Sequence, residues 1–227
     1  MPSFGKAQFT LLEKLCNAIG VSGDEGEVRK IVLDEIKPYA DDVKVDAMGS
    51  VLAIRHGRGK KRVRVMVDAH MDEVGFFIVA DEGEGIYQFA TVGGIDSRHL
   101  LGKQVYVGRN HTPGVIGGKP IHLMGVEERS HKVPVDALRI DVGVAGVVNV
   151  GDRAGFATKF RRVGPSIMAK SIDDRIGVAT LIELFKQAPS NIDLCAALSV
   201  QEEIGLRGAK VAAQYFKPDM AIAIDSL

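Results

Sequence analysis

The sequence predicts an α/β domain interrupted by a β-rich insertion, and two observations lead to this fold class. Towards both ends of the 227-residue chain, helical patterns alternate with short apolar runs that are typical of buried strands. Between them, β-branched runs alternate with glycine-rich turns such as Gly117-Gly118, which favours a small barrel or sandwich. We therefore expect residues 1–73 and 163–227 to form one α/β domain and residues 74–162 to form a second domain.

The first α/β segment carries two helical patterns and then three strands. Apolar residues recur with helical spacing from Phe9 to Ile19, and Gly20 is placed to end that helix. A second helix is expected from about Glu25, ending before Pro38. The strands predicted here cover residues 43–45, 50–55 and 62–67, and the last of these is valine-rich and expected to be buried.

Helix and strand patterns return after the β-rich region. Residues 173–187 read as a strongly apolar helix and residues 192–200 as a strand. Residues 208–216 predict another helix, and residues 220–224 predict another strand. The alternation supports one α/β domain built from both ends of the sequence.

The composition excludes several classes of protein. Hydrophobic residues make up 46% of the chain, which is too many for a disordered protein. Lys plus Arg equals Asp plus Glu at 29 each, so charge gives no reason to expect nucleic acid or a membrane as partner. No run approaches the roughly 18 apolar residues of a membrane helix. Residues 1–10 lack a secretory signal pattern, and we expect Cys16 and Cys195 to be buried thiols in the reducing cytoplasm.

Side chains that commonly bind metals follow the predicted strands. His70 and Asp72 come after the run that ends at Val67, and Glu202-Glu203 follow the run over residues 194–200. Asp225 follows residues 221–224 in the same way. In an open α/β sheet, sites collect beyond the carboxyl ends of the strands, so we expect these side chains to converge.

The His70–Asp72 spacing suits a metal ligand and its support. Residues two apart in an extended chain point the same way, so His70 can offer a ring nitrogen while Asp72 orients the ring. A structural histidine at a strand end is the alternative. Asp173 opens the apolar helix, where an acid commonly caps the helix or suits its dipole. Asp173 could instead bridge two metals with its two oxygens. Asp225 could likewise be a metal ligand or, alternatively, a helix-cap or turn residue.

Glu202 and Glu203 form the most specific motif. Two carboxylates at the end of a buried strand repel each other unless a cation or a proton resolves the conflict. One could bind a metal while the other acts as general base towards water, and a solvated loop is the alternative. Carboxylates with a histidine suit zinc, cobalt or manganese, and a shared aspartate allows two ions roughly 3.5 Å apart.

In chain order these motifs resemble a known family. The sequence contains His-x-Asp, Asp-Asp-Arg, Glu-Glu-x-Gly-x-x-Gly-Ala and Ile-Asp. This order is similar to that of the tetrahedral aminopeptidases, dinuclear zinc or cobalt metallopeptidases that include glutamyl and deblocking aminopeptidases and relatives labelled as endoglucanases. The other matching segments are Ser22-Gly23, Val92-Gly93-Gly94, Pro113-Gly114-Val115-Ile116-Gly117 and Leu138-Arg139-Ile140-Asp141-Val142-Gly143.

The resemblance implies a fold and a set of residue roles. The fold would be a mixed-sheet, zinc-peptidase-like catalytic domain interrupted by a β-barrel-like insertion that serves dimerisation. His70 and Asp225 would bind one divalent metal and Glu203 the other, with Asp173 bridging them. Glu202 would be the general base, and Asp72 would orient or tune the site.

The implied function is metal-dependent removal of N-terminal residues from peptides by a cytoplasmic hydrolase. The implied partners are two divalent ions, zinc or cobalt, peptide substrates, and copies of the same chain in dimers and dodecamers.

Two departures from the family pattern bear on this expectation. Residues 144–150 are compressed, and family members continue beyond the position of Leu227 to supply a final histidine to the metal held by Glu203. The sequence therefore predicts one site that lacks its final histidine. An alternative is a truncated, non-catalytic member acting as an assembly or regulatory subunit. A third reading, glycoside hydrolysis by Glu202 and Glu203, ranks last because adjacent residues cannot readily flank a sugar from opposite sides and His70 is left without a role.

Overall fold

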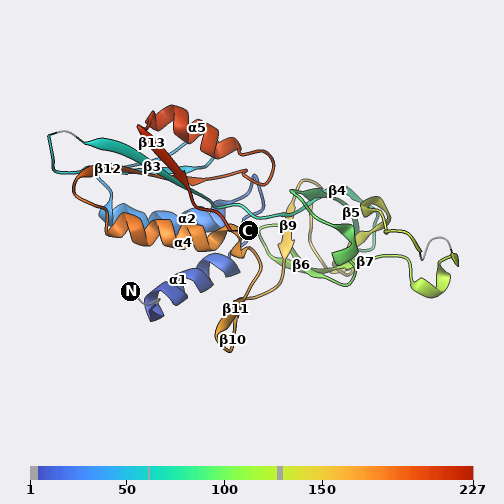
Figure 1. Cartoon of the computed structure of the whole chain (residues 1–227). Helices are drawn as coiled ribbons and strands as arrows, with labels where there is room; N and C mark the ends of the chain where they lie inside the picture. The colour runs from blue at the N-terminus through green and yellow to red at the C-terminus, as the bar shows by residue number, and fades with distance from the viewer. Residues whose placement is uncertain (1–4, 61, 127–129, 227) are drawn as a thin grey trace. The chain divides into compact units, whose positions relative to one another are not determined.

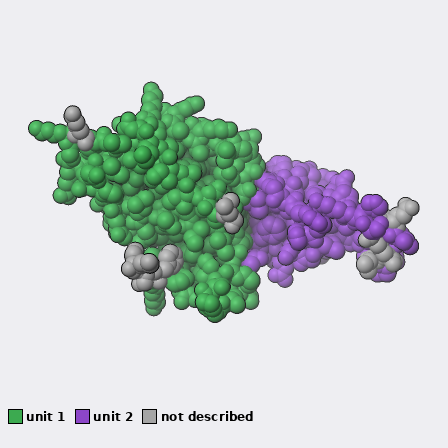
Figure 2. All heavy atoms as spheres, in the orientation of Figure 1, with its two compact units in different colours: residues 1–73, 159–227 green, residues 74–158 purple. Residues whose placement is uncertain are grey.

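The computed structural model describes residues 5–60, 62–126 and 130–226. The chain forms two compact units, Met1–Glu73 with Lys159–Leu227 as unit 1 and Val74–Thr158 as unit 2 (Figure 2). Residues 1–4, 61, 127–129 and 227, which fall inside the predicted domain ranges, lie outside the described residues. No helix among the described residues combines the length and apolarity needed to cross a bilayer.

Unit 1 is built on a five-stranded mixed sheet. Its strands, in spatial order, are β1 (Asp42–Val45), β2 (Val51–Arg55), β12 (Ile192–Ser199), β3 (Val63–His70) and β13 (Met220–Ala223). The β1–β2 and β2–β12 pairs are antiparallel, whereas β12–β3 and β3–β13 are parallel. The predicted strand over residues 62–67 is longer than expected, because parallel pairing with β12 continues to His70.

Helices cover both faces of this sheet (Figure 1). The helices on one face are α1 (Lys6–Asn17), α2 (Gly26–Ile36) and α4 (Ile172–Lys186), with the short 3₁₀ helix η1 (Lys37–Tyr39) after α2. Helix α5 (Arg207–Phe216) packs on the opposite face. Alternate residues of β12 face opposite ways: Leu194 and Ala196 join the larger core, while Cys195 and Ala197 pack with Phe216 of α5.

The start of α4 departs from a regular helix. Asp173 and Asp174 have non-helical dihedrals, with φ/ψ of −76°/112° and −115°/40°. The preceding Ser171 has a positive φ of 52°. The hairpin of β10 (Arg161–Val163) and β11 (Ser166–Met168) leads into this segment. The two aspartates are therefore presented by irregular backbone at the start of the helix rather than on its regular surface.

Unit 2 is a closed barrel. Its strands are β4 (Gly75–Asp81), β5 (Ile86–Val92), β6 (Gln104–Val107), β7 (Thr112–Gly117), β8 (Arg139–Asp141) and β9 (Arg153–Phe156). They close in the order β4-β5-β8-β7-β6-β9 around a core that includes Phe76, Phe89 and Ile140. Short 3₁₀ turns η2 (Ser97–His99), η3 (Ile121–Leu123) and η4 (Val135–Ala137) lie in its connections. The predicted fold class, a mixed α/β sheet interrupted by a β-barrel-like insertion, is confirmed.

Candidate metal centre at the strand ends

The parallel strands bring the predicted site residues to one edge of the sheet. Ser199 of β12 lies opposite His70 of β3, and Ala223 of β13 lies opposite Asp68. The Ile224 N–H donates to the Asp68 carbonyl at 2.8 Å, which carries the chain on towards Asp225. Parallel strands end at the same edge, so the residues after β12, β3 and β13 share one space.

Three side chains meet at this edge. The Nε2 atom of His70 lies 3.0 Å from Oδ1 of Asp173 and 3.9 Å from Oδ1 of Asp225. One potential ligand atom from each residue lies within 4.8 Å of the others. We refer to His70, Asp173 and Asp225 as the strand-end cluster. It joins the end of β3, the irregular start of α4 and the residues after β13.

The chemistry of this cluster fits a divalent cation. His70 is buried, while the Asp173 and Asp225 side chains are 54% and 56% exposed. The cluster is therefore shielded from solvent on the side of His70 and open to solvent on the side of the two aspartates. Two carboxylate oxygens converge on a single ring nitrogen, which carries at most one proton. One imidazole nitrogen with carboxylate oxygens is a ligand set that suits zinc, cobalt or manganese. His70, Asp173 and Asp225 are therefore the residues that could hold a metal.

Asp72 lies behind the cluster and is completely buried. Its Oδ1 accepts a hydrogen bond from the Glu202 N–H at 3.0 Å, and its Oδ2 accepts one from the Glu203 N–H at 3.2 Å. The Nδ1 atom of His70 lies 3.2 Å from the Asp72 carbonyl oxygen and 3.5 Å from Oδ1. Burial opposes the charged carboxylate, but hydrogen bonds from His70, Ser22 and the Glu202 backbone lower the pKa of Asp72. An ionised Asp72 holds the proton of His70 on Nδ1, which leaves Nε2 facing the cluster.

His70 sits among excess negative charge. Burial disfavours the protonated ring, but the hydrogen bond and charge of Asp72 outweigh it, with further contributions from Asp174 and Glu202. Together they raise the pKa of His70 to about 9. In the metal-free chain a proton on His70 thus supplies the positive charge that the surrounding carboxylates require.

Glu202 and Glu203 follow β12 in a tight turn. The Gly205 N–H donates to the Glu202 carbonyl at 2.9 Å, and Gly205 adopts a φ of +124° that only glycine takes without strain. The Oε2 atom of Glu202 lies 3.9 Å from His70 Nε2, so the turn brings this carboxylate to the cluster. Glu203 is not part of the three-residue group of ligand atoms, although its backbone is bound to Asp72.

Burial raises the pKa of both glutamates. The pKa of Glu202 is raised mainly by burial, and the nearby carboxylates of Asp72 and Asp225 add to the shift. Burial also raises the pKa of Glu203, to about 7. A carboxylate whose pKa lies close to neutrality can both take up and release a proton at physiological pH.

Two further buried aspartates were missed in the sequence. Asp174 is completely buried, its Oδ1 accepts the Gly177 N–H at 3.0 Å, and its Oδ2 has no hydrogen-bond partner among the described residues. Burial raises the pKa of Asp174 to about 7. Asp68 accepts the Ser199 hydroxyl at 3.2 Å, and burial raises its pKa to about 6. The spacing of Asp68, His70 and Asp72 along one strand could have indicated the second of these.

A buried ion cluster of Glu73, Lys170 and Arg175 lies next to Asp72 and Asp173 in the sequence. Lys170 Nζ lies 2.6 and 2.8 Å from the two carboxylate oxygens of Glu73, and Arg175 Nη2 lies 3.2 Å from Oε1. The Gly20 N–H donates to the same carboxylate at 2.9 Å, and Lys170 also donates to the Ala18 carbonyl at 2.7 Å. This cluster ties the end of α1 to the segments that carry the metal-type residues.

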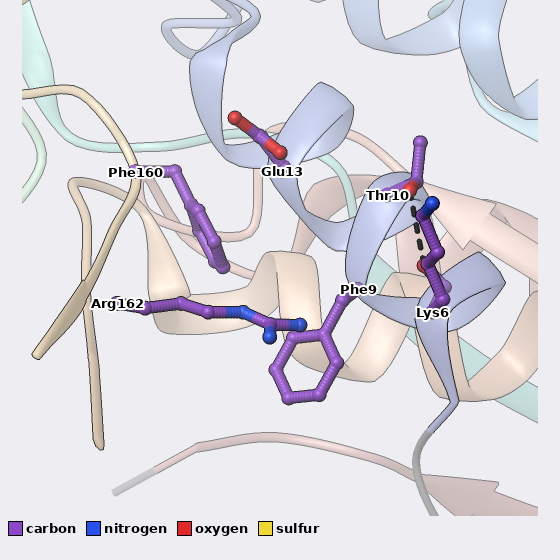
Figure 3. A pocket seen from close by; sticks show the side chains of 6 residues that line it. All are labelled: Lys6, Phe9, Thr10, Glu13, Phe160 and Arg162. Carbon is purple, nitrogen blue, oxygen red and sulfur yellow. Dashed lines mark hydrogen bonds between the residues drawn. The ribbon is translucent and has the colours of Figure 1, made fainter. Parts of the chain in front are cut away.

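A groove elsewhere in unit 1 is separate from this site. It has a volume of about 490 Å³ and lies between α1 and the segment that enters β10 (Figure 3). Its lining residues are Lys6, Phe9, Thr10, Glu13, Phe160 and Arg162. The Arg162 guanidinium stacks 3.7 Å from the centre of the Phe9 ring, and no residue of the strand-end cluster contributes.

Comparison with known proteins supplies the family. The family model described as M42 glutamyl aminopeptidase matches residues 49–227. The lysyl aminopeptidase of Pyrococcus furiosus is 34% identical over 228 residues, which cover 95% of this chain and 65% of that protein. The chain spans between 61% and 66% of the length of five curated relatives.

Solved structures agree with this. The TET aminopeptidase of the archaeon Thaumarchaeota archaeon SCGC AB-539-E09 superposes with a TM-score of 0.90 at 34% identity, covering 97% of this chain and 66% of that one. The TET1 peptidase of Pyrococcus horikoshii, which can assemble into a tetrahedron or a large octahedral shell, gives a TM-score of 0.86 at 36% identity. The superposition covers 97% of this chain and 69% of that one. The family resemblance noted in the sequence is confirmed, and the chain belongs to the M42 glutamyl aminopeptidase family.

Proposed function

We propose that this chain carries the metal centre of an aminopeptidase that removes N-terminal residues from peptides. The observation that carries the proposal is the convergence of His70, Asp173 and Asp225, with one ligand atom of each within 4.8 Å of the others, in a chain of the M42 family. Aminopeptidases of this family are hydrolases that need divalent metals. The chain spans less than two thirds of its curated relatives, so the activity of the whole protein is part of the proposal.

Zinc or cobalt is the proposed metal. His70 and Asp225 would hold one ion, Asp173 would be shared, and Glu203 would contribute to a second. When bound, such ions polarise the scissile carbonyl and make water a stronger acid. The support in this chain is the donor set itself, because a group of one imidazole and two carboxylates suits these metals.

Proton transfer falls to Glu202. Its carboxylate lies 3.9 Å from His70 Nε2, inside the site, and burial raises its pKa towards that of a useful general base. Glu202 would take a proton from the attacking water as the water oxygen bonds to the carbonyl carbon. It would then deliver that proton to the leaving amide nitrogen as the C–N bond breaks. Asp72 would keep the His70 ring oriented throughout, through the contacts described above.

The open side of the cluster suits a peptide amino terminus. The exposed carboxylates of Asp173 and Asp225 present negative charge to a substrate ammonium group, which would bring the first peptide bond near Glu202. The relatives include both a lysyl and a glutamyl aminopeptidase.

The domains of the chain, its self-assembly and its cellular location are also part of the proposed function. We propose that the catalytic domain is residues 1–73 with 163–227, and that the barrel-containing insertion, residues 74–162, mediates dimers within a larger homo-oligomer. The shells formed by the Pyrococcus horikoshii relative support an assembly of this kind. A cytoplasmic location is supported by Cys16 and Cys195, which are both buried and unpaired.

The experiment is an assay of the purified 227-residue chain on aminoacyl nitroanilides with zinc or cobalt added. Wild type should turn substrate over, and Glu202→Gln should lower kcat by at least about 100-fold while leaving metal affinity unchanged. Glu13→Gln, an exposed glutamate on α1, is the matched control and should behave as wild type. Turnover retained by Glu202→Gln would remove the general-base assignment. Metal bound without any turnover by wild type would instead contradict the aminopeptidase activity of this chain.

A further inference from the structure

The Ser22-Gly23 motif lies between α1 and α2, about 50 residues before the site, and has no part in the proposed chemistry. Ser22 is buried, and its hydroxyl donates to Oδ2 of Asp72 at 2.6 Å. We propose that Ser22 is a positioning residue for the metal centre: it fixes the Asp72 carboxylate and, through it, the His70 ring and the Glu202–Glu203 backbone. This inference rests on the proposed metal centre.

Asp72 is the point where four donors meet. Its Oδ1 faces the Glu202 N–H and the Nδ1 atom of His70, and its Oδ2 accepts from Ser22 and from the Glu203 N–H. The Ser22 contact, at 2.6 Å, is the shortest of the four, and the other three range from 3.0 to 3.5 Å. A short hydrogen bond to an ionised acceptor is stronger than a hydrogen bond between two neutral groups. Ser22 is therefore well placed to set the plane of the Asp72 carboxylate.

The backbone around Ser22 holds the hydroxyl in place. Val21 forms a parallel β-bridge with Glu73. The Ser22 N–H donates to the Glu73 carbonyl at 3.4 Å, and the Glu73 N–H donates to the Gly20 carbonyl at 3.0 Å. A turn follows, in which the Asp24 N–H donates to Val21 at 2.8 Å and Gly23 has a φ of +90°. The segment is thus paired to the residues that directly follow β3. The position of the hydroxyl is set by this pairing rather than by a mobile loop.

Removal of the hydroxyl would act on the centre through Asp72. Oδ2 would keep only the Glu203 N–H as a donor, and a completely buried carboxylate with one donor fewer is held less firmly in one orientation. A less firmly held Asp72 would fix the His70 tautomer less well, and partners of this kind typically change metal affinity by about 10-fold or more. Because its hydroxyl donates to Asp72, Ser22 would act on the strand-end cluster through that carboxylate, as a positioning residue rather than a ligand.

The test measures zinc affinity of the complete 227-residue chain by competition with a chromophoric chelator, well below the unfolding temperature. Ser22→Ala should bind zinc about 10-fold more weakly than wild type. The matched control is Ser50→Ala, because Ser50 is also completely buried but its hydroxyl has no hydrogen-bond partner among the described residues. This control should bind zinc as wild type does.

A double-mutant cycle separates positioning from a general structural effect. If Ser22 acts through Asp72, Ser22→Ala should have little further effect on zinc affinity in an Asp72→Asn background. An unchanged zinc affinity in Ser22→Ala, or an equal loss in both backgrounds, would overturn the inference, even where the variant is less stable to urea.

The ring-nitrogen NMR signals of His70 in the metal-free chain give a second readout. These signals should shift in Ser22→Ala and remain in place in Ser50→Ala, and unshifted signals in Ser22→Ala would count against the positioning role. This readout distinguishes the two proposals: a wild type that binds no zinc contradicts the proposed function, while the His70 signals still report whether Ser22 orders the ring.

Discussion

Asp72 and Glu73 are neighbours at the end of β3, but they belong to regions that balance charge in opposite ways. Glu73 sits in the buried ion cluster, where one carboxylate faces Lys170 and Arg175 and also accepts the Gly20 N–H. In the other region, the carboxylates of Asp173, Asp225 and Glu202 gather around the ring of His70. The first region is complete as a structural unit, whereas the second has more negative charge than its one histidine can balance.

The difference shows how a binding site can be told from a structural ion pair. A buried charge is stable when partners and hydrogen bonds satisfy it, as in the buried ion cluster. Carboxylates with raised pKa values, and an Asp174 oxygen with no hydrogen-bond partner in the described part of the chain, mark a place that lacks a positive charge. The same substitution, a neutralised acid, should therefore have opposite effects on the metal-free chain in the two regions.

The largest effect is expected from Glu73→Gln. This change leaves Lys170 and Arg175 buried without their counter-charge, which should cost about 3–5 kcal/mol of unfolding free energy. Urea denaturation in the presence of a chelator measures it. A loss of unfolding free energy below about 1 kcal/mol would mean that Lys170 and Arg175 are not buried against Glu73 as they are in the structure.

Zinc bound at the strand-end cluster should stabilise the folded chain by mass action. At a free concentration about 100 times its dissociation constant, a ligand that binds only the folded chain adds about 2.7 kcal/mol of unfolding free energy. The gain should disappear on adding a chelator and should be absent in Asp225→Asn. Equal stabilisation of wild type and Asp225→Asn would place the metal elsewhere in the chain.

Neutralising Glu203 should stabilise the metal-free chain. The pKa of Glu203 is raised from 4.5 to about 7, mainly by burial. Its contribution to stability is therefore fully present below pH 4.5 and is lost as the pH rises to about 7. Glu203→Gln stays neutral throughout, so it should be more stable than wild type at pH 8 by ~1 kcal/mol, after allowance for solvent screening of this half-buried group. Urea curves at pH 4.5 and pH 8 in chelator measure the difference, and a variant less stable than wild type at pH 8 would contradict it.

The smallest effect should come from Glu35→Gln, which matches Glu73→Gln in chemistry but not in burial. Glu35 pairs with Lys186 at 2.7 Å, and its side chain is 30% exposed. Pairs this accessible to water contribute about 0–1 kcal/mol. A loss as large as that of Glu73→Gln would show that burial is not what separates the two ion pairs.

The sequence predicted most of the fold because hydrophobic spacing is local. The helix ending before Pro38 and the apolar strand at residues 192–200 both appear, as α2 and β12. The register of β3 with β12 and β13 depends on contacts between distant residues, and for that reason the extension of β3 to His70 was missed.

The candidate site was predictable in its residues but not in its supports. His70 and Asp225 stood out by type and by their position after strands, and Asp173 stood out as an acid at the start of an apolar helix. Ser22 carried only a motif match, and nothing local indicated that it meets Asp72 from 50 positions away. Lys170 and Arg175 likewise look like ordinary surface cations in sequence, and only tertiary packing shows them buried against Glu73.

The most direct test of the metal centre is equilibrium dialysis of the chain against zinc or cobalt, with the bound metal counted by mass spectrometry. Wild type should retain metal, and Asp173→Asn should lose most of it while keeping its fold by circular dichroism, because Asp173 joins His70 to the rest of the cluster. Equal metal content in the two proteins, or none in wild type, would contradict the account.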